Sequence, residues 1–181
     1  MRLLILINPQ IDFCEGGALE IEGANEFLKK TSEQISNFDK IICIKEWHPA
    51  NHICFAANHP WRYPGQIIQF KGKEIRLMLT HCVQNQFGAM VHPILKEIKF
   101  DLEINVGSDQ FQESDQQLST MIEKKLASFF KSQNIEEVKF LGLVHNEFVN
   151  NLEKNLLHFF PNIRIFPSDI LNYSHPESNL K

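Results

Sequence analysis

Apolar runs of strand length recur along this chain. Residues 3–7, 41–44 and 138–144 are rich in aliphatic side chains, as expected for strands that are buried on both faces. Residues 102–106 and 163–166 are typical of two more strands. The pattern therefore predicts a sheet whose strands come from both halves of the chain.

Stretches with helical spacing separate these strands. Apolar residues recur on one face over about residues 24–38 and 118–131, and a further helix is expected over residues 146–160. Alternating strands and helices predict an α/β fold, in which a mostly parallel sheet carries helices on both faces. Since 43% of the 181 residues are hydrophobic, we expect residues 1–181 to form one domain with a sizeable core.

One long stretch, residues 48–86, does not follow this alternation. It is rich in aromatic residues, proline and glycine, and loops of this length inside a compact domain are usually functional. In parallel sheets, ligands bind beyond the carboxyl ends of the strands. Asn8, Glu46, Val106 and the turn at residues 144–148 all lie at such ends, so we expect them to converge.

The charges exclude some classes of partner. The chain has 18 basic and 22 acidic residues, a formal charge of -4 and no long run of one sign, so neither nucleic acid nor an anionic membrane is expected. The first apolar run is too short for a membrane span and lacks a signal-peptide cleavage site. The four cysteines lack CxxC spacing, so we expect a cytoplasmic protein with reduced thiols.

The strongest chemical signal lies at the end of the second apolar run. Glu46, His48 and His52 follow it closely, and His81 lies near the end of the long loop region. Carboxylate and imidazole groups are common ligands of Zn, Mn and Fe, and residues i and i+2 at a strand end lie on one face. Spacing alone leaves a second interpretation open, namely a salt-bridged glutamate beside surface histidines.

Longer motifs resemble those of one enzyme family. Residues 4–19 are LILINPQIDFCEGGAL, and residues 47–52 and 81–85 are WHPANH and HCVQN. In order and spacing, these motifs are similar to those of nicotinamidases and pyrazinamidases, which are isochorismatase-like hydrolases. The resemblance covers most of the chain and implies a three-layer α/β fold, shortened here at the C-terminus.

This resemblance implies a metal site. In the family, an Asp-x-His pair and two later histidines hold a metal ion that the pyridine nitrogen of the substrate reaches. The corresponding residues in this chain are Glu46, His48, His52 and His81. Glutamate keeps the charge of aspartate but adds a methylene group. We therefore expect a divalent metal ion, Zn, Mn or Fe, as a cofactor.

The resemblance also implies a mechanism that this chain cannot carry out. The family hydrolyses an amide through a thioester, using a cysteine nucleophile, an aspartate that accepts the thiol proton and a supporting lysine. The matching residues here are Phe148, Asn8 and Val106. Because none of them has the nucleophilic, basic or charged group that its position requires, we expect a catalytically inactive pseudoenzyme.

The expected ligand pocket is altered as well. Gln10 and Phe13 match the family, whereas Met78 stands where the family has a stacking tryptophan. Val144 and His145, in the turn that presents the family's nucleophile, complete the expected pocket. We expect a small aromatic or pyridine-type ligand to be bound there rather than cleaved.

Three alternatives stay open. A metal-activated water with Glu147 or His145 as its base would make the chain an active amidohydrolase that converts nicotinamide to nicotinate and ammonia. A displaced thiol, Cys14 or Cys54, would also restore activity. The chain stops at Lys181 without the family's last helix and strand, so an open sheet edge favours a homo-oligomer or a paralogue as partner.

Overall fold

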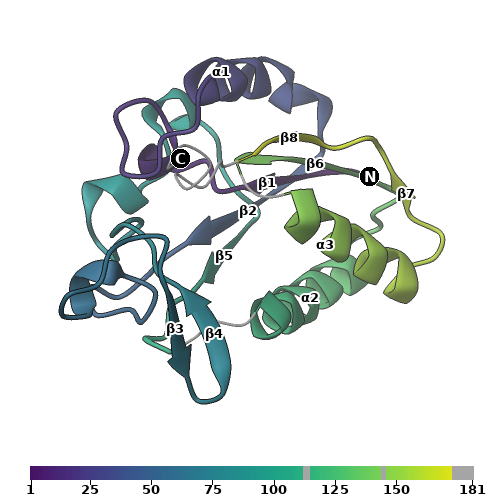
Figure 1. Ribbon diagram of the computed structural model, residues 1–181. Coiled ribbons are helices and arrows are strands. Elements are labelled where there is room, and N and C mark those ends of the chain that lie inside the picture. The colour runs from purple at the N-terminus through teal and green to yellow at the C-terminus, as the bar shows by residue number, and fades with distance from the viewer. Residues whose placement is uncertain (112–114, 144–145, 173–181) are drawn as a thin grey trace.

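The computed structural model describes residues 1–111, 115–143 and 146–172. Its centre is a six-stranded sheet in the order β5-β2-β1-β6-β7, and β8 pairs with β6 as well (Figure 1). All of these pairings are parallel, which confirms the predicted sheet. The strands are β1 (Arg2–Ile7), β2 (Lys40–Glu46), β5 (Leu102–Val106), β6 (Glu137–Leu143), β7 (Arg164–Ile165) and β8 (Asp169–Leu171).

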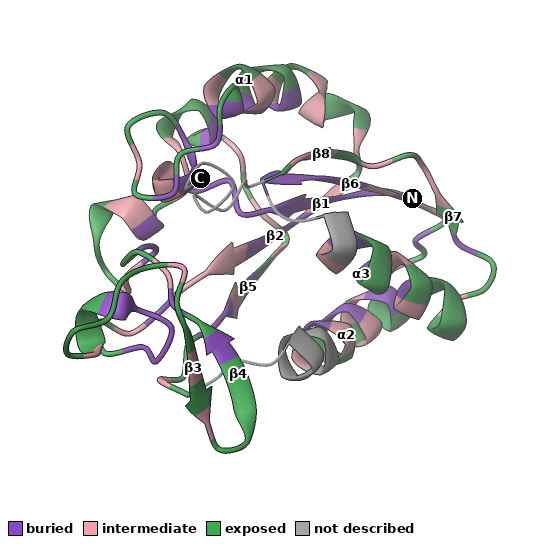
Figure 2. Cartoon of the chain, viewed as in Figure 1, coloured by how far each residue is buried: buried purple, intermediate pink, exposed green. Residues whose placement is uncertain are grey.

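Helices cover both faces of this sheet, as predicted: α1 lies on one face, and α2 and α3 lie on the other (Figure 1). Alternate residues of β1 point to the two sides. Leu4 and Leu6 belong to the core on the α1 side. Leu3, Ile5 and Ile7 belong to the core under α2 and α3. Figure 2 shows the resulting burial of the central strands. The helices are α1 (Ala24–Gln34), α2 (Asp115–Ser132) and α3 (Asn146–Phe159).

Residues 48–86 form a lobe with structure of its own rather than one irregular loop. It contains an antiparallel hairpin of β3 (Ile67–Phe70) and β4 (Lys73–Arg76), which the apolar pattern does not predict. A small apolar core lies inside the lobe. Phe70 stacks on Phe111 with ring centroids 5.3 Å apart. This stack ties the hairpin to the loop that follows β5.

Most element boundaries lie within a few residues of those predicted. The main difference is α1, which ends at Gln34 and is followed by a 3-10 turn (Ile35–Asn37). The predicted last strand is shorter, as β7, and β8 is an addition. Among the described residues, no helix is both long and apolar enough to cross a membrane. The other 3-10 turns are Ile11–Phe13, Ala56–Asn58, Phe87–Ala89 and Pro93–Leu95.

Candidate metal centre

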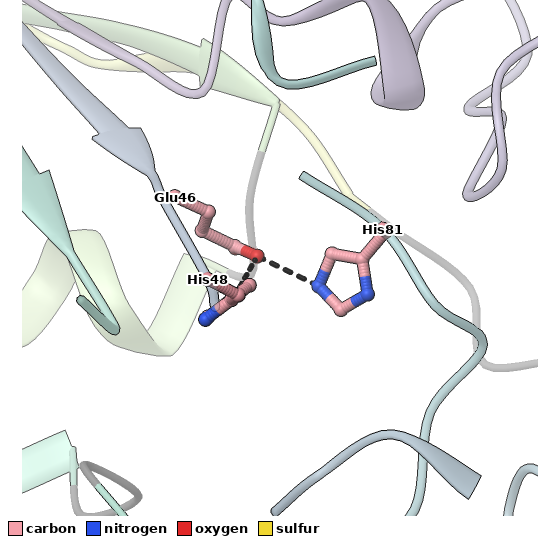
Figure 3. A group of neighbouring side chains, drawn as sticks. All are labelled: Glu46, His48 and His81. Carbon is pink, nitrogen blue, oxygen red and sulfur yellow. Dashed lines mark hydrogen bonds and ion pairs between the residues drawn. The ribbon is translucent and has the colours of Figure 1, made fainter. Parts of the chain in front are cut away.

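Three side chains with metal-ligand chemistry meet beyond the carboxyl end of β2. Glu46 ends this strand, His48 follows two residues later, and His81 comes from the last part of the lobe. Nε2 of His48 lies 3.1 Å from Oε2 of Glu46, and Nε2 of His81 lies 2.8 Å from the same oxygen (Figure 3). One potential ligand atom from each residue lies within 4.8 Å of the other two. The fold thus gathers three of the expected ligands into one cluster.

A main-chain carbonyl fixes the far side of each imidazole ring. Nδ1 of His48 lies 3.0 Å from the oxygen of Gly107, and Nδ1 of His81 lies 2.7 Å from the oxygen of Leu79. Because a carbonyl oxygen can only accept, Nδ1 of both rings carries the hydrogen and donates it. Nε2 of each ring faces Glu46, so it donates to the carboxylate while it carries a hydrogen and offers a lone pair to a metal ion once that hydrogen is lost. Metal-binding histidines usually have their other nitrogen anchored in this way.

Burial and charge oppose each other in this cluster. Burial alone would raise the pKa of Glu46, but hydrogen bonds from His48 and His81 outweigh it and hold that pKa well below its usual range. Burial alone would lower the pKa of His81, but the hydrogen bond and the charge of Glu46 raise it. The pocket therefore favours positive charge around one carboxylate. A carboxylate and two imidazole Nε2 atoms in such a place are a donor set that fits a divalent first-row metal.

Main-chain hydrogen bonds hold the two histidine segments side by side. The N–H of His48 donates to the oxygen of Cys82 at 2.9 Å, and the N–H of Gln84 donates to the oxygen of His48 at 2.8 Å. Oδ2 of Asp12 accepts the N–H of Cys82 at 2.6 Å. Cys82 has a φ of 45°, in the left-handed region that few side chains favour. The position of His81 therefore depends on contacts from two other segments, those of His48 and Asp12.

The fourth expected ligand, His52, lies beside the cluster but is not a member of it. Its ring centroid is 4.3 Å from that of His48, and the residue is 1% exposed. Nδ1 of His52 lies 2.9 Å from Sγ of Cys54. A role for His52 as a metal ligand stays a prediction.

Of the residues expected in place of the catalytic triad, two lie beside Glu46 and the third packs against the apolar core under α2 and α3. Asn8 is buried, and its Nδ2 donates to Oε1 of Glu46 at 3.0 Å. Val106 pairs with Glu46 in the register of β2 and β5 and is 5% exposed. Phe148, near the start of α3, packs partly buried against the same apolar core as Val106. The predicted convergence of Asn8, Glu46 and Val106 is confirmed.

Gln10, for which a place in the ligand pocket stays a prediction, holds the main chain of Glu46. Its Nε2 donates to the oxygen of Glu46 at 2.7 Å and to that of Ala89 at 2.9 Å. Its Oε1 accepts the N–H of Glu46 at 2.8 Å, and the side chain is fully buried. The amide of Gln10 thus serves to position Glu46, because all of its hydrogen-bonding atoms are used on the main chain.

Two other expected pocket residues, Phe13 and Met78, are described by the structure, and Phe13 contacts the cluster. Phe13 is buried and meets His81 edge to face, with ring centroids 6.1 Å apart. Met78 is half-buried and packs against both the core on the α1 side and the core of the lobe. Val144 and His145, the remaining members of the expected pocket, lie outside the described residues.

Cys14, one of the two thiols considered as a displaced nucleophile, is in its unreactive protonated form. Cys14 is 1% exposed, and its Sγ donates to the oxygen of Gln10 at 3.3 Å. Burial, together with the negative charge of Glu15, raises the pKa of Cys14 to about 12. The thiol is therefore protonated at neutral pH, which removes the nucleophilic form.

Some residues that shape the metal centre have little or no signal in the sequence. Leu79 and Gly107 act through main-chain oxygens, which every residue has. Gly107 carries one usable signal, since a glycine directly after a predicted strand often marks a positive φ or a close contact, and both occur here. Asp12 lies inside a motif that matches the family, but its bond to the turn after His81 has no sequence signal.

The chain is similar in sequence to known nicotinamidases. No protein-family model matches it. The nicotinamidase of Acinetobacter baylyi is 33% identical over 147 residues, which cover 77% of this chain and 67% of that protein. The nicotinamidase of Escherichia coli is 37% identical over 103 residues, which cover 53% of this chain and 46% of that protein.

Solved structures share the fold. A nicotinamidase/pyrazinamidase from an Acinetobacter species aligns with a TM-score of 0.69 at 21% identity, over 91% of this chain and 95% of the other. The pyrazinamidase of Pyrococcus horikoshii, solved in complex with zinc, aligns with a TM-score of 0.57 at 18% identity, over 91% and 98% of the two chains. With the sequence match to the Acinetobacter baylyi enzyme, this fold shows that the chain belongs to the nicotinamidase family of isochorismatase-like hydrolases.

Proposed function

We propose that this protein binds a divalent metal ion on a nicotinamidase scaffold and has lost the hydrolytic chemistry of the family. The observation that carries the proposal is the cluster of Glu46, His48 and His81, in which both imidazoles turn Nε2 toward the carboxylate. Anchored by carbonyls at Nδ1, these rings need little rearrangement to act as ligands.

The donor set suits Zn, Mn or Fe, because imidazole and carboxylate are ligands for all three. The relative from Pyrococcus horikoshii was solved with zinc, which makes zinc the first ion to test. When bound, such an ion would supply a Lewis acid. Glu46, His48 and His81 would hold it, and Asn8 and Gln10 would orient Glu46.

Loss of the chemistry is proposed from three positions. Asn8 presents an amide that donates to Glu46 and cannot take up a thiol proton at neutral pH. Val106 and Phe148 belong to the apolar core and have no charge or nucleophilic atom. This core also explains why these side chains are favourable where they are, since each removes apolar surface from water.

The proposed ligand is a small aromatic or pyridine-type molecule, because the relatives are named for nicotinamide. Phe13 supplies apolar surface beside His81, and Met78 packs against the same apolar core as Phe13. A ligand with a ring nitrogen would be bound there and left intact. We propose that the protein acts as a binding or partner protein rather than as an enzyme.

Metal binding is tested by equilibrium dialysis of metal-free protein against Zn, Mn or Fe(II), followed by elemental analysis. We expect about one ion per chain in the unchanged protein and little in the Glu46→Gln and His81→Ala variants, because each loses a ligand. His158→Ala, which removes an exposed histidine of α3, is the matched control and should bind as the unchanged protein does. Binding that survives both cluster substitutions would reject the proposed site.

The retained donor set also supports a second function, namely an amidohydrolase with a rewired mechanism. Such an enzyme would convert nicotinamide and water to nicotinate and ammonia. The two functions differ in ammonia release by metal-loaded protein, which is absent in the first and depends on His48 and Glu46 in the second.

A further inference from the structure

The two carboxylate oxygens of Glu46 have different partners. Oε2 faces His48 and His81 (Figure 3). Oε1 accepts a hydrogen bond from Nδ2 of Asn8 at 3.0 Å. One oxygen is thus directed to the metal ligands, and the other is held by an amide.

Burial and a main-chain hydrogen bond hold Asn8 in the position from which its side chain reaches Glu46. Asn8 follows β1 directly, is 3% exposed, and its N–H donates to the oxygen of Ile44 at 2.7 Å. This bond extends the pairing of β1 and β2 past Ile7 and brings residue 8 level with the end of β2. The φ of Asn8 is 51°, in the left-handed region where asparagine is better tolerated than most residues.

Both residues of this contact, Asn8 and Glu46, differ from the family pattern. The resemblance implies an aspartate both at position 8 and at position 46, whereas this chain has Asn8 and Glu46. An aspartate at position 8 would put a second carboxylate against Oε1 of Glu46, and two like charges in contact at a buried site repel strongly. In this chain the amide of Asn8 donates to Oε1 instead. Its partner, Glu46, is the other changed residue, whose side chain is one methylene group longer than that of aspartate.

We propose that Asn8 is a positioning residue of the metal centre, which fixes Oε1 of Glu46 so that Oε2 stays directed at His48 and His81. The inference rests on the proposed metal-binding function. It gives position 8 a changed role, in which the residue supports a ligand through a hydrogen bond and does not act on a proton. Gln10 holds the main chain of Glu46, so the strand end and its side chain are fixed separately.

The test compares metal affinity and coordination in two variants. Asn8→Gly removes the donor while a positive φ stays favourable. Asn85→Gly is the matched control, because Asn85 also has a positive φ of 62° but is exposed. Zn affinity is measured by competition with a chromophoric chelator, and the visible absorption spectrum of the Co(II)-loaded protein reports the ligand arrangement.

We expect Asn8→Gly to weaken Zn binding by about tenfold to a hundredfold, the usual effect of losing a bond that orients a ligand, and to change the Co(II) spectrum. Asn85→Gly should change neither. Unchanged affinity and spectrum in Asn8→Gly would overturn the positioning role. Absence of Zn from the unchanged protein would instead overturn the proposed function.

An experiment without metal distinguishes failure of the positioning role of Asn8 from failure of the proposed metal-binding function. Thermal unfolding with a chelator present is compared for Asn8→Asp and for the double variant Asn8→Asp/Glu46→Gln. We expect the midpoint to fall in Asn8→Asp and to recover in the double variant, because donor and acceptor are exchanged across the same contact. The double variant should still bind metal poorly, since the amide that replaces the carboxylate of Glu46 lacks the ligand's charge. A midpoint that does not recover would overturn the proposed contact, even where Asn8→Gly fails to fold.

Discussion

The main-chain oxygen of Gly107 lies 3.0 Å from Nδ1 of His48, and a Cβ at position 107 would overlap the imidazole ring. Gly107 is therefore needed for two reasons. Its φ of 66° is unfavourable for other residues, and only a hydrogen leaves room for the ring that its carbonyl orients. A residue with no side chain thus sets the direction of a proposed metal ligand.

Gly107→Ala should weaken metal binding by about tenfold to a hundredfold, because the added methyl group displaces the ring of His48. Gly72→Ala is the matched control. Gly72 also has a positive φ, of 75°, but a Cβ there meets nothing within 4 Å. Chelator competition measures both affinities. Equal losses in the two variants would show that backbone strain, and not the contact with His48, causes the effect.

Phe148→Ala should lower the free energy of unfolding by about 2–3 kcal/mol, because a half-buried aromatic ring is removed from the core under α2 and α3. Phe159→Ala, in the same helix, removes a ring that is 57% exposed and should cost far less. Urea unfolding measures both. A loss at position 148 no larger than at position 159 would contradict the view that Phe148 serves the core.

The Cys14 thiol should react slowly with iodoacetamide in the native protein. Its pKa of about 12, raised by burial and by Glu15, lies far above that of a free cysteine, so below pH 8 its thiolate fraction is lower by roughly a thousandfold. At pH 7 to 8, labelling of Cys14 should therefore be far slower in the native protein than in the denatured protein. Peptide mass spectrometry of native and denatured protein measures this. Rapid native labelling of Cys14 at pH 7 would favour a displaced nucleophile.

Asp12→Ala should reduce stability by about 1–3 kcal/mol, because the buried N–H of Cys82 loses its acceptor. Metal affinity should fall as well, since this bond holds the turn that carries His81. Asp109→Ala is the control, because Asp109 caps an exposed N–H of Phe111. Urea unfolding in the presence of a chelator separates the stability effect from metal binding. Identical results for the two variants would remove Asp12 from the account.

The fold was largely predictable because short aliphatic runs alternate with longer stretches of helical spacing. The aliphatic runs of β1 and β2 and the helical spacing of α2 are all strong signals. The β3–β4 hairpin escaped prediction because its strands are only four residues long and mostly exposed. Its turn, Lys71-Gly72, has positive φ at both positions, yet it lacks the Asn-Gly or Asp-Gly pair that marks such turns.

The metal cluster was predictable in its residue types but not in its supports. Glu46 and His48 follow a predicted strand, and the resemblance adds His81. The sequence cannot show that His52 lies against His48 outside the cluster. Nor can it show that the amide of Gln10 is used by main-chain groups, because such bonds depend on how distant segments pack.

Ammonia release from nicotinamide decides whether this protein has lost the hydrolytic chemistry of its family. The protein is first loaded with Zn, Mn or Fe(II), its metal content is established by elemental analysis, and the nicotinamidase of Acinetobacter baylyi serves as the positive control. We expect about one bound ion per chain and no ammonia above the metal-only blank, even at high protein concentration. Ammonia release above that blank, lost on His48→Ala, would contradict this expectation and establish a metal-dependent amidohydrolase.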